Sequence, residues 1–412
     1  MKEKRSRKII PAVWSAALGC MICAGGIRTA FSFWENLERT WEHTEVVWKD
    51  EERIWKSPES QKRESDCLWS DGGEQTEHAQ REQGKEISVP IWKETAFQEA
   101  DAVPETSDDY RYEEAFEQVL SAYGQFENLY CEDYSTAIPG LENTSFISDA
   151  TDQMVPQGIC IAEDYMLITA YDKAGEENSV IYVLSNQDPA DRRLLTTLVL
   201  PDQNHVGGIT CDGSRVWIAK STTKYLSMIT CERIRDAVSS GQETVFLGKY
   251  DANLYCGVTA SFISYQDQRL WVGTSQSFFS KQGELNVFRM LEDERHLRLV
   301  RQFTMEIPSH AQGISFLDEG DKTYLLLNAS HGRFRDSELY VYEQYINDER
   351  VVLQGTLRYT FPPMVEELVC DGAYTYCLFE SAATCYSTVS GMKCRYPVDR
   401  VCALDNRLLV EG

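Results

Sequence analysis

The chain has 412 residues, a formal net charge of -25 and a pI near 4.7. This acidic balance argues against nucleic acid and anionic lipid headgroups as partners, because phosphate recognition needs a concentrated basic face. Aromatic residues make up 11% of the chain, enough to fill the core of one large domain. The last five cysteines are spaced seven to nine residues apart, which fits no C-x-x-C metal pair, so the sequence predicts no zinc site.

Residues 1–28 combine a basic flank with an apolar run. Five Lys and Arg residues between Lys2 and Lys8 precede an uncharged stretch from Ile9 to Ile27. As a helix that stretch spans roughly 28 Å, close to the hydrocarbon thickness of a bilayer. It is interpreted as an uncleaved signal anchor or a cleaved signal peptide, with lipidation at Cys20 as a third alternative. The basic flank stays in the cytoplasm, so the C-terminal domain is expected outside the cell membrane, either held by a single pass or secreted.

Residues 29–56 carry tryptophans at a regular spacing. Trp34, Trp41, Trp48 and Trp55 recur every seven residues among charged residues, which predicts an amphipathic juxtamembrane helix. Its stripe suits self-association or a position on the membrane surface, and a simple stalk with interfacial aromatics is the alternative. From 57 to 107 the composition is polar and acidic with few aliphatic residues, which predicts a disordered linker.

A second, short amphipathic helix is predicted over residues 108–128. Ser107 has the character of a helix cap, and the acidic residues that follow it suit a helix N-terminus. Phe116, Val119 and Tyr123 fall on one apolar stripe, and Gly124 is expected to end the helix. The stripe predicts that the helix packs on the outside or the lower rim of the domain that follows.

Residues 129–412 contain a repeated phrase, a polar residue followed by Gly-Ile or Gly-Val, with an apolar triplet about ten residues later. The copies are Gln157-Gly158-Ile159, Gly207-Gly208-Ile209, Cys256-Gly257-Val258, Gln312-Gly313-Ile314 and the degenerate Glu366-Glu367-Leu368. Their second residues are 50, 49, 56 and 54 positions apart. This period suits one four-stranded antiparallel unit and is too long for a helical hairpin.

Apolar runs between polar turns place the remaining strands of each copy. The fourth strand of the second copy is predicted at 244–249, and the third strand of the fifth copy at 385–388. The Ser390-Gly391 turn suggests a hairpin across which Cys385 and Cys394 form a disulfide. Residues 401–404 and 407–410 are predicted to be two further strands, which pair with strands from about residues 130–155 in a split unit that closes a ring.

The period, the Gly-Ile/Val first strands and the Asp-Gly turns at Asp212-Gly213 and Asp371-Gly372 together resemble the β-propeller repeat proteins, specifically the extracytoplasmic, membrane-tethered propellers of bacteria. The resemblance covers roughly residues 129–412. It implies an all-β fold of five or six four-stranded blades, preceded by the membrane helix, the disordered acidic linker and the short amphipathic helix. The Trp-Asp dipeptide and the kelch double glycine are absent as regular features. A pair of β-sandwiches or a β-helix is the alternative fold, although β-helix coils are much shorter than 50 residues.

Propeller topology gathers two sets of residues at one rim of the central channel, those just before each first strand and those just after each second strand. Two of the six histidines, His205 and His310, hold matching places in their repeats. Polar groups that converge at one mouth are the usual location of a propeller ligand site. The predicted ligand-binding residues are Gln157, Tyr171, His205, Lys220, His310, Gln312, Glu366, Glu367 and Glu380.

The rim is predicted to bind a protein, peptide or glycan, which makes the chain a binding module at the cell envelope. The alternative is a propeller hydrolase or lyase, glycan-directed or metal-assisted, that uses the rim carboxylates and histidines. No G-x-S-x-G elbow, phosphate loop or H-E-x-x-H signal occurs. The sequence identifies no catalytic residue, metal ligand or cofactor, and leaves open a divalent cation in the channel. A carboxylate pair with perturbed pKa values would favour catalysis, and an exposed aromatic rim would favour partner binding.

Overall fold

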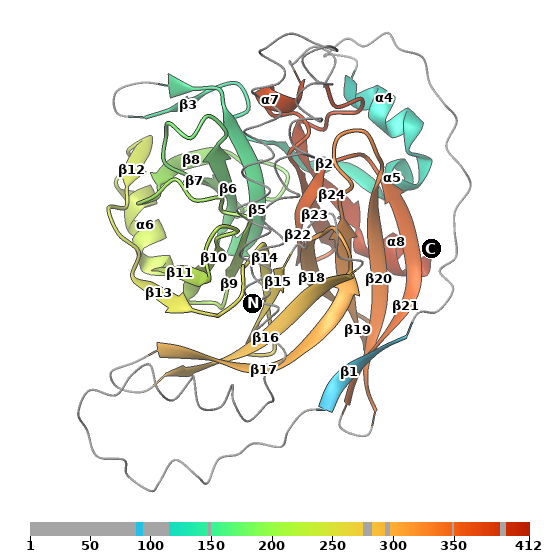
Figure 1. Ribbon diagram of the computed structural model, residues 1–412. Coiled ribbons are helices and arrows are strands. Elements are labelled where there is room, and N and C mark those ends of the chain that lie inside the picture. Colours follow the sequence, from blue (N-terminus) through green and yellow to red (C-terminus); the bar gives the residue numbers. More distant parts are fainter. Residues whose placement is uncertain are drawn as a thin grey trace, which may run out of the picture. The chain divides into compact units, whose positions relative to one another are not determined.

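Within the described residues, five large sheets surround a common central axis, and their innermost strands contact one another in a closed ring (Figure 1). The computed structural model describes residues 88–93, 115–146, 150–274, 282–292, 297–347, 350–387 and 393–412. The predicted membrane segment, the tryptophan stripe and most of the predicted linker lie outside these ranges. In the described ranges no helix has both the length and the apolar character that a membrane crossing requires.

Each sheet is one blade of a β-propeller. Blade 1 contains β5 (Met154–Ala162), β6 (Tyr165–Asp172), β7 (Val180–Ser185) and β8 (Leu194–Val199). Blade 2 contains β9 (Gly208–Cys211), β10 (Arg215–Ala219), β11 (Tyr225–Thr230) and β13 (Ala252–Tyr255). Blade 3 contains β14 (Phe262–Gln266), β15 (Arg269–Thr274), β16 (Gln282–Glu292) and β17 (Leu297–Pro308). Blade 4 contains β18 (Ala311–Glu319), β19 (Lys322–Ala329), β20 (Ser337–Asn347) and β21 (Arg350–Phe361).

Blade 5 is built from two distant parts of the chain. Its strands are β22 (Val365–Asp371), β23 (Tyr374–Phe379), β24 (Arg400–Asp405) and, at the outer edge, β2 (Tyr130–Ala137). Strand β2 precedes blade 1 in the sequence but pairs antiparallel with β24, beside which Figure 1 shows it. The predicted closure, in which residues 401–404 pair with a strand from residues 130–155, is therefore confirmed. A separate split unit is not, because these strands complete the fifth repeat, and the described ring has five blades and not six.

The prediction of a second closing strand at residues 407–410 is wrong. These residues belong to helix α8 (Asn406–Glu411). The side chain of Asp405 accepts hydrogen bonds from the backbone N–H groups of Arg407 and Leu408, which satisfies two donors at the helix start. A capped helix at this point ends the pairing with β23, so only 401–404 joins the blade.

The fourth strand of blade 2 also differs from the prediction. Residues 244–246 form β12 (Thr244–Phe246), which pairs in parallel with β8 as a fifth strand of blade 1. The fourth strand of blade 2 is instead β13. The cause is helix α6 (Cys231–Ser239), whose buried Ile234 and Ala237 share a core cluster with Leu198 of blade 1 and bring the following chain to the edge of that blade.

Residues 385–388 do not form the predicted third strand of the fifth repeat. They lie mostly in helix α7 (Thr384–Ser387), where Ala383 and Tyr386 pack with Met364 and Val155. These apolar contacts hold the segment as a short helix instead of a strand. Both cysteines are free thiols, and the predicted disulfide is wrong.

The third copy of the repeated phrase was misplaced by a few residues. Gly257 lies in a loop with a positive φ of 79°, and the inner strand of blade 3 begins at Phe262. Phe262 takes the place that Gly158 and Gly208 hold in blades 1 and 2. With 158, 208, 262, 313 and 367 as the equivalent positions, the intervals become 50, 54, 51 and 54 residues, more even than the sequence phrase indicated.

Helices α4 (Ala115–Ala122) and α5 (Gly124–Leu129) lead into β2. Phe116, Val119 and Phe126 are buried against Phe361 and Phe379 of blades 4 and 5. The part of the predicted helix before residue 115 lies outside the described ranges, and Gly124 begins α5 instead of ending the helical segment. Within the range predicted to be a linker, β1 (Ser88–Lys93) pairs in parallel with β21. A short pair, β3 (Thr144–Ser145) and β4 (Ala150–Thr151), completes the described strands.

The split blade makes a testable prediction about truncated chains. A chain that begins at residue 115 keeps α4, α5 and β2, whereas one that begins at 138 loses the outer strand of blade 5 and the apolar contacts of both helices. We expect the shorter chain to lose its cooperative thermal transition or to melt at least about 10 °C lower, because a buried edge and its cluster are exposed. Equal melting temperatures for the two chains would contradict closure by β2.

Candidate functional site

The inner strands of three blades carry an irregularity at their first residues. Pairing between inner and second strand shifts register at Gln157 in β5, at Gln312 in β18 and at Glu366–Glu367 in β22. A bulge of this kind re-aims a side chain that would otherwise alternate with its neighbours. Four of the predicted site residues lie at these points, although nothing in the sequence signalled the bulges.

Glu367 occupies the axis of the propeller. Its side chain is 1% exposed, and its Oε2 accepts hydrogen bonds at 2.9 Å from the backbone N–H groups of Ile159 and Ile209. Its Oε1 accepts a third, longer bond at 3.3 Å from Ile263. One carboxyl group from blade 5 thus binds the inner strands of blades 1, 2 and 3. Burial raises the pKa of Glu367 well above its usual range, and the three N–H donors oppose that shift.

The repeated glycines make room for this side chain. A Cβ at Gly158 would lie 2.9 Å from Oε2 of Glu367, and one at Gly208 would lie 2.8 Å from its Oε1. At Gly313 a Cβ would lie 2.8 Å from the Cα atom of Glu367. The glycines of the repeated phrase therefore leave the space that an axial carboxyl needs, and they do not only mark the inner strands.

Glu366 and Glu380 form a carboxyl pair at the channel mouth. The side chains of Glu366 and Glu380 interact directly, and Oε2 of Glu380 accepts a hydrogen bond at 3.0 Å from Nε2 of Gln157. The hydroxyl of Tyr386 adds a further bond to Glu380. Glu366 and Gln157 are buried, whereas Glu380 is partly buried at the end of β23. Two carboxyl groups in such contact hold one proton between them.

Burial is the main cause of the unusual protonation of this pair. It raises the pKa of Glu366 well above the usual range, and the charge of Glu380 adds to the effect. Burial also raises the pKa of Glu380, to about 7, against the opposing charge of Lys173 and the bond from Gln157. Near neutral pH the pair therefore sits close to a change of protonation, as acid–base groups in functional sites commonly do.

Two aromatic side chains and a lysine lie over the carboxyl pair. The ammonium of Lys173 lies 5.7 Å from the ring centroid of Tyr171 and 5.8 Å from that of Tyr386, and donates to the Tyr171 hydroxyl at 3.3 Å. The ring of His205 meets that of Tyr171 edge to face, with centroids 4.3 Å apart. Burial, with a contribution from Lys173, lowers the pKa of His205 to about 4, so this imidazole is neutral at pH 7.

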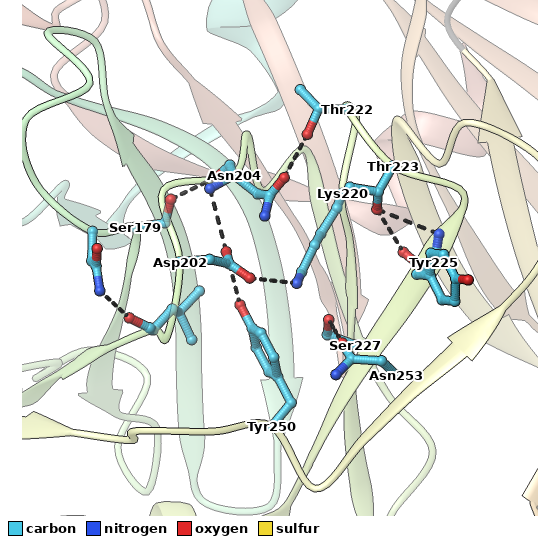
Figure 2. A network of polar contacts seen from close by, with 12 residues as sticks. Ser179, Asp202, Asn204, Lys220, Thr222, Thr223, Tyr225, Ser227, Tyr250 and Asn253 are labelled. Carbon is cyan, nitrogen blue, oxygen red and sulfur yellow. Dashed lines mark hydrogen bonds and ion pairs between the residues drawn. The ribbon is translucent and has the colours of Figure 1, made fainter.

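Lys220, although buried, is committed to a different network (Figure 2). Its Nζ lies 2.6 Å from Oδ2 of Asp202 and 4.0 Å from the ring centroid of Tyr250. The Tyr250 hydroxyl donates to Asp202 at 3.3 Å. Burial works against ionisation of Asp202, but the bonds from Lys220 and Asn204 outweigh it and lower the pKa of that carboxyl. The charge of Lys220 is therefore neutralised by Asp202 at the boundary between blades 1 and 2.

His310 belongs to a third group of residues. Its backbone has a φ of 63°, and its ring centroid lies 5.0 Å from that of His331. Nε2 of His331 lies 3.2 Å from Oε2 of Glu338, which also accepts a bond from Tyr340 and pairs with Arg358. His205 and His310 still occupy equivalent places, since their carbonyls accept from the backbone N–H groups of Ser221 and Ser330. Their side chains nevertheless enter separate networks.

The structure thus brings Gln157, Tyr171, His205, Glu366 and Glu380 together at the mouth and places Glu367 in the channel. Gln312 is partly buried in the bulge of β18. Lys173 and Tyr386 were missed by the sequence reading. Lys173 lies two residues beyond Tyr171, the rim position that the repeat predicted, and Tyr386 fell inside a stretch assigned to a strand.

A buried amide near the axis has no protein partner within the described chain. Both polar atoms of the Asn328 side chain lack hydrogen bonds, although the residue is fully buried. Asn328 pairs with Gly313, beside the backbone of Glu366 and Glu367. An unpaired buried amide costs about 1–3 kcal/mol, which a bound polar group or water would recover. Over the described residues no three His, Cys, Asp or Glu side chains gather in a way that could hold a metal ion.

Comparison with known proteins adds only broad likenesses. No protein-family model and no curated protein sequence matches the chain. Among solved structures, the chain is similar to the glutaminyl cyclase of Myxococcus xanthus, with a TM-score of 0.36 and 10% identity over 61% of this chain and 91% of that one. It is also similar to the nidogen/laminin complex, with a TM-score of 0.30 and 11% identity over 57% of this chain and 78% of that one. For apo AztD from Citrobacter koseri the TM-score is 0.29, with 12% identity over 56% of this chain and 58% of that one. Likeness at this level assigns no activity.

The axial carboxyl can be tested by substitution. In Glu367→Gln one oxygen becomes an NH2 group that faces an N–H donor, so we expect the free energy of unfolding to fall by about 1–3 kcal/mol in denaturant titrations. The matched control is Glu306→Gln on the exposed face of β17, which should change stability by less than about 0.5 kcal/mol. Equal stabilities for the two variants would remove the role assigned to Glu367.

The carboxyl pair predicts a dependence of stability on pH. The folded-state pKa of Glu380 is raised to about 7 from the ordinary 4.5, so its contribution is fully present below about pH 4.5 and is lost as pH rises through about 7. We expect the wild-type melting temperature to fall over this window relative to that of Glu380→Gln, measured in the same buffers. Parallel profiles would show that Glu380 titrates normally.

Proposed function

We propose that the chain is a ligand-binding β-propeller, and that its site is the channel mouth formed by Glu366, Glu380, Gln157, Tyr171 and Tyr386. We further propose that the ligand presents a cationic amine. The observation that supports this most directly is the position of Lys173, whose own ammonium lies over the two tyrosine rings and beside the carboxyl pair.

The surroundings of the Lys173 ammonium are those of an amine site. Two aromatic rings attract a cation through their faces, a carboxylate supplies the opposite charge, and the Tyr171 hydroxyl accepts a hydrogen bond at 3.3 Å. Lys173 is itself exposed and has a long flexible stem, so a stronger ligand amine can displace it at low cost. In the free protein the lysine acts as a tethered occupant of the site.

Other groups at the mouth suit a ligand with polar parts beyond the amine. His205 is neutral near pH 7 and offers one donor and one acceptor beside Tyr171. Asn328 offers an unpaired amide near the backbone of Glu366 and Glu367. An amine-bearing peptide or amino sugar has both a cationic group and such polar neighbours, which narrows the protein, peptide or glycan partners expected from the sequence.

Acid–base catalysis at the same mouth is the second candidate. It is favoured by the proton shared between Glu366 and Glu380, since such a pair can accept a proton at one carboxyl while the other donates. Glycoside cleavage by this pair fits less well, because the carboxyl groups of glycosidases stand about 5 Å or more apart, and those of Glu366 and Glu380 hydrogen-bond directly. A hydrolase or lyase that activates water through the pair is the form of catalysis that remains.

The cellular setting is part of the proposal. The basic flank and apolar run of residues 1–28 support a membrane anchor or signal with the propeller outside the cell membrane. The heptad tryptophans at 34, 41, 48 and 55 support self-association next to the membrane. An anchored ring with an acidic mouth would capture amine-bearing ligands at the cell envelope.

Binding of n-butylammonium and of its anionic counterpart butyrate, measured by calorimetry at pH 7.5, tests the ligand class. We expect Lys173→Ala to bind n-butylammonium about three to ten times more tightly than wild type, because the tethered competitor is gone. Glu380→Gln should bind it about tenfold more weakly, because a charge-assisted hydrogen bond is lost.

Lys322→Ala, which removes an exposed lysine at the β18–β19 turn, is the matched control and should bind n-butylammonium as wild type does. Butyrate that binds wild type and is weakened by Lys173→Ala would show that the site takes anions instead. Failure of n-butylammonium to bind any of these proteins would contradict the amine proposal.

A further inference from the structure

Two cysteines lie in contact where β9 of blade 2 ends and helix α6 begins. Cys211 ends β9, and Cys231 begins helix α6 after β11. Their sulfur atoms are 3.7 Å apart. A disulfide needs about 2.05 Å, so a small side-chain movement would join them. The pair is separate from the mouth and from the Cys385–Cys394 pairing that the sequence suggested.

The local backbone holds both thiols in place. The N–H of Cys231 donates to the carbonyl of Ser214 at 2.9 Å, and Arg215 pairs with Thr230 across β10 and β11. A side-chain oxygen of Asp212 accepts from the backbone N–H of Arg215 at 2.8 Å, which fixes the turn between Cys211 and β10. The contact between the sulfurs is therefore a product of strand register and turn geometry, and not of two mobile loops.

The two thiols have different environments. Cys211 is partly exposed; its sulfur lies 3.7 Å from that of Cys231 and accepts a hydrogen bond at 3.3 Å from the N–H of Gly213. The contact with Cys231 lowers the pKa of Cys211, although burial and the carboxylates of Asp212 and Glu163 oppose the shift. Cys231 is 2% exposed, and its contact with Cys211 together with burial raises its pKa.

We propose that Cys211 and Cys231 form a dithiol–disulfide site in which Cys211 is the attacking thiol and Cys231 the resolving thiol. A partly exposed thiol in contact with a buried second thiol is the arrangement that thiol–disulfide exchange requires. The co-reactant is a small disulfide such as oxidised glutathione, which approaches Cys211 from solvent.

The exchange balances in two steps. The Cys211 thiolate attacks one sulfur of the small disulfide, a new S–S bond forms on Cys211, and the first small thiolate leaves and takes up a proton. The Cys231 thiol then loses its proton to solvent and attacks the Cys211 sulfur, which releases the second small thiol. The two cysteines lose two electrons and two protons, and the small disulfide gains both.

The bond would tie the first strand of blade 2 to helix α6, and it would close a segment that contains β10 and β11. Cross-links of this length restrict the unfolded chain. Since α6 carries the chain from blade 2 back to β12 at the edge of blade 1, oxidation would fasten the boundary between the two blades.

The experiment treats the full chain with oxidised glutathione, quenches it with N-ethylmaleimide, and maps the peptides by mass spectrometry. We expect a peptide pair joined through Cys211 and Cys231, and a melting temperature higher than that of the reduced chain by about 5 °C. Cys377 and Cys402, which are buried register partners on β23 and β24, are the internal control and should not react in the folded chain.

Single variants separate the two roles. Cys231→Ser should trap one glutathione on Cys211, whereas Cys211→Ser should leave Cys231 unmodified because it is buried. Free Cys211 and Cys231 after oxidation of the wild type, or glutathione on Cys231 in preference to Cys211, would overturn the proposal. The wild-type peptide map decides the matter even if a variant fails to fold.

Discussion

The propeller depends on one carboxyl group at its axis. Five inner strands that meet around a narrow channel bring backbone N–H groups together where strand pairing within the blades cannot satisfy them, and a buried donor without a partner is costly. Glu367 accepts hydrogen bonds from the backbone N–H groups of Ile159, Ile209 and Ile263, one residue from each of three blades. The neighbouring glycines leave the space that its side chain fills. The contact joins blade 5 to blades 1, 2 and 3 and accounts for the glycines of the repeated phrase.

The axial position of Glu367 also shapes the mouth. Glu366 and Glu367 lie together in the register shift of β22, and because of this bulge their side chains make different contacts. Glu367 enters the channel, and Glu366 meets Glu380 at its end. The bulge therefore links the device that holds the ring together to the carboxyl pair that we propose as the ligand site. Lys173, over the rings of Tyr171 and Tyr386, places a positive charge near this carboxyl pair.

Much of the fold could be predicted because its signal is periodic. The interval near 50 residues and the Gly-Ile/Val phrases predict the blades. The strand predicted at 401–404 pairs with β2 and closes the ring. What escaped prediction was decided by contacts between distant residues. Asp405 caps a helix where a strand was expected, α6 carries residues 244–246 to the edge of blade 1, and Tyr386 packs into the core instead of extending a hairpin. At the site, the rim positions followed from topology, but the carboxyl pairing, the bulges and Lys173 depend on side-chain directions that spacing alone does not reveal.

The most direct test of the axial carboxyl is hydrogen exchange, measured by NMR at the backbone amides of Ile159, Ile209 and Ile263. These three N–H groups belong to different blades and have Glu367 in common. If the carboxyl holds them as described, they exchange as slowly as the amides at the centres of β6 and β19, and only when the whole propeller unfolds. Rapid exchange at these three positions, at the rate of amides in the exposed loops, would contradict an axis built on Glu367.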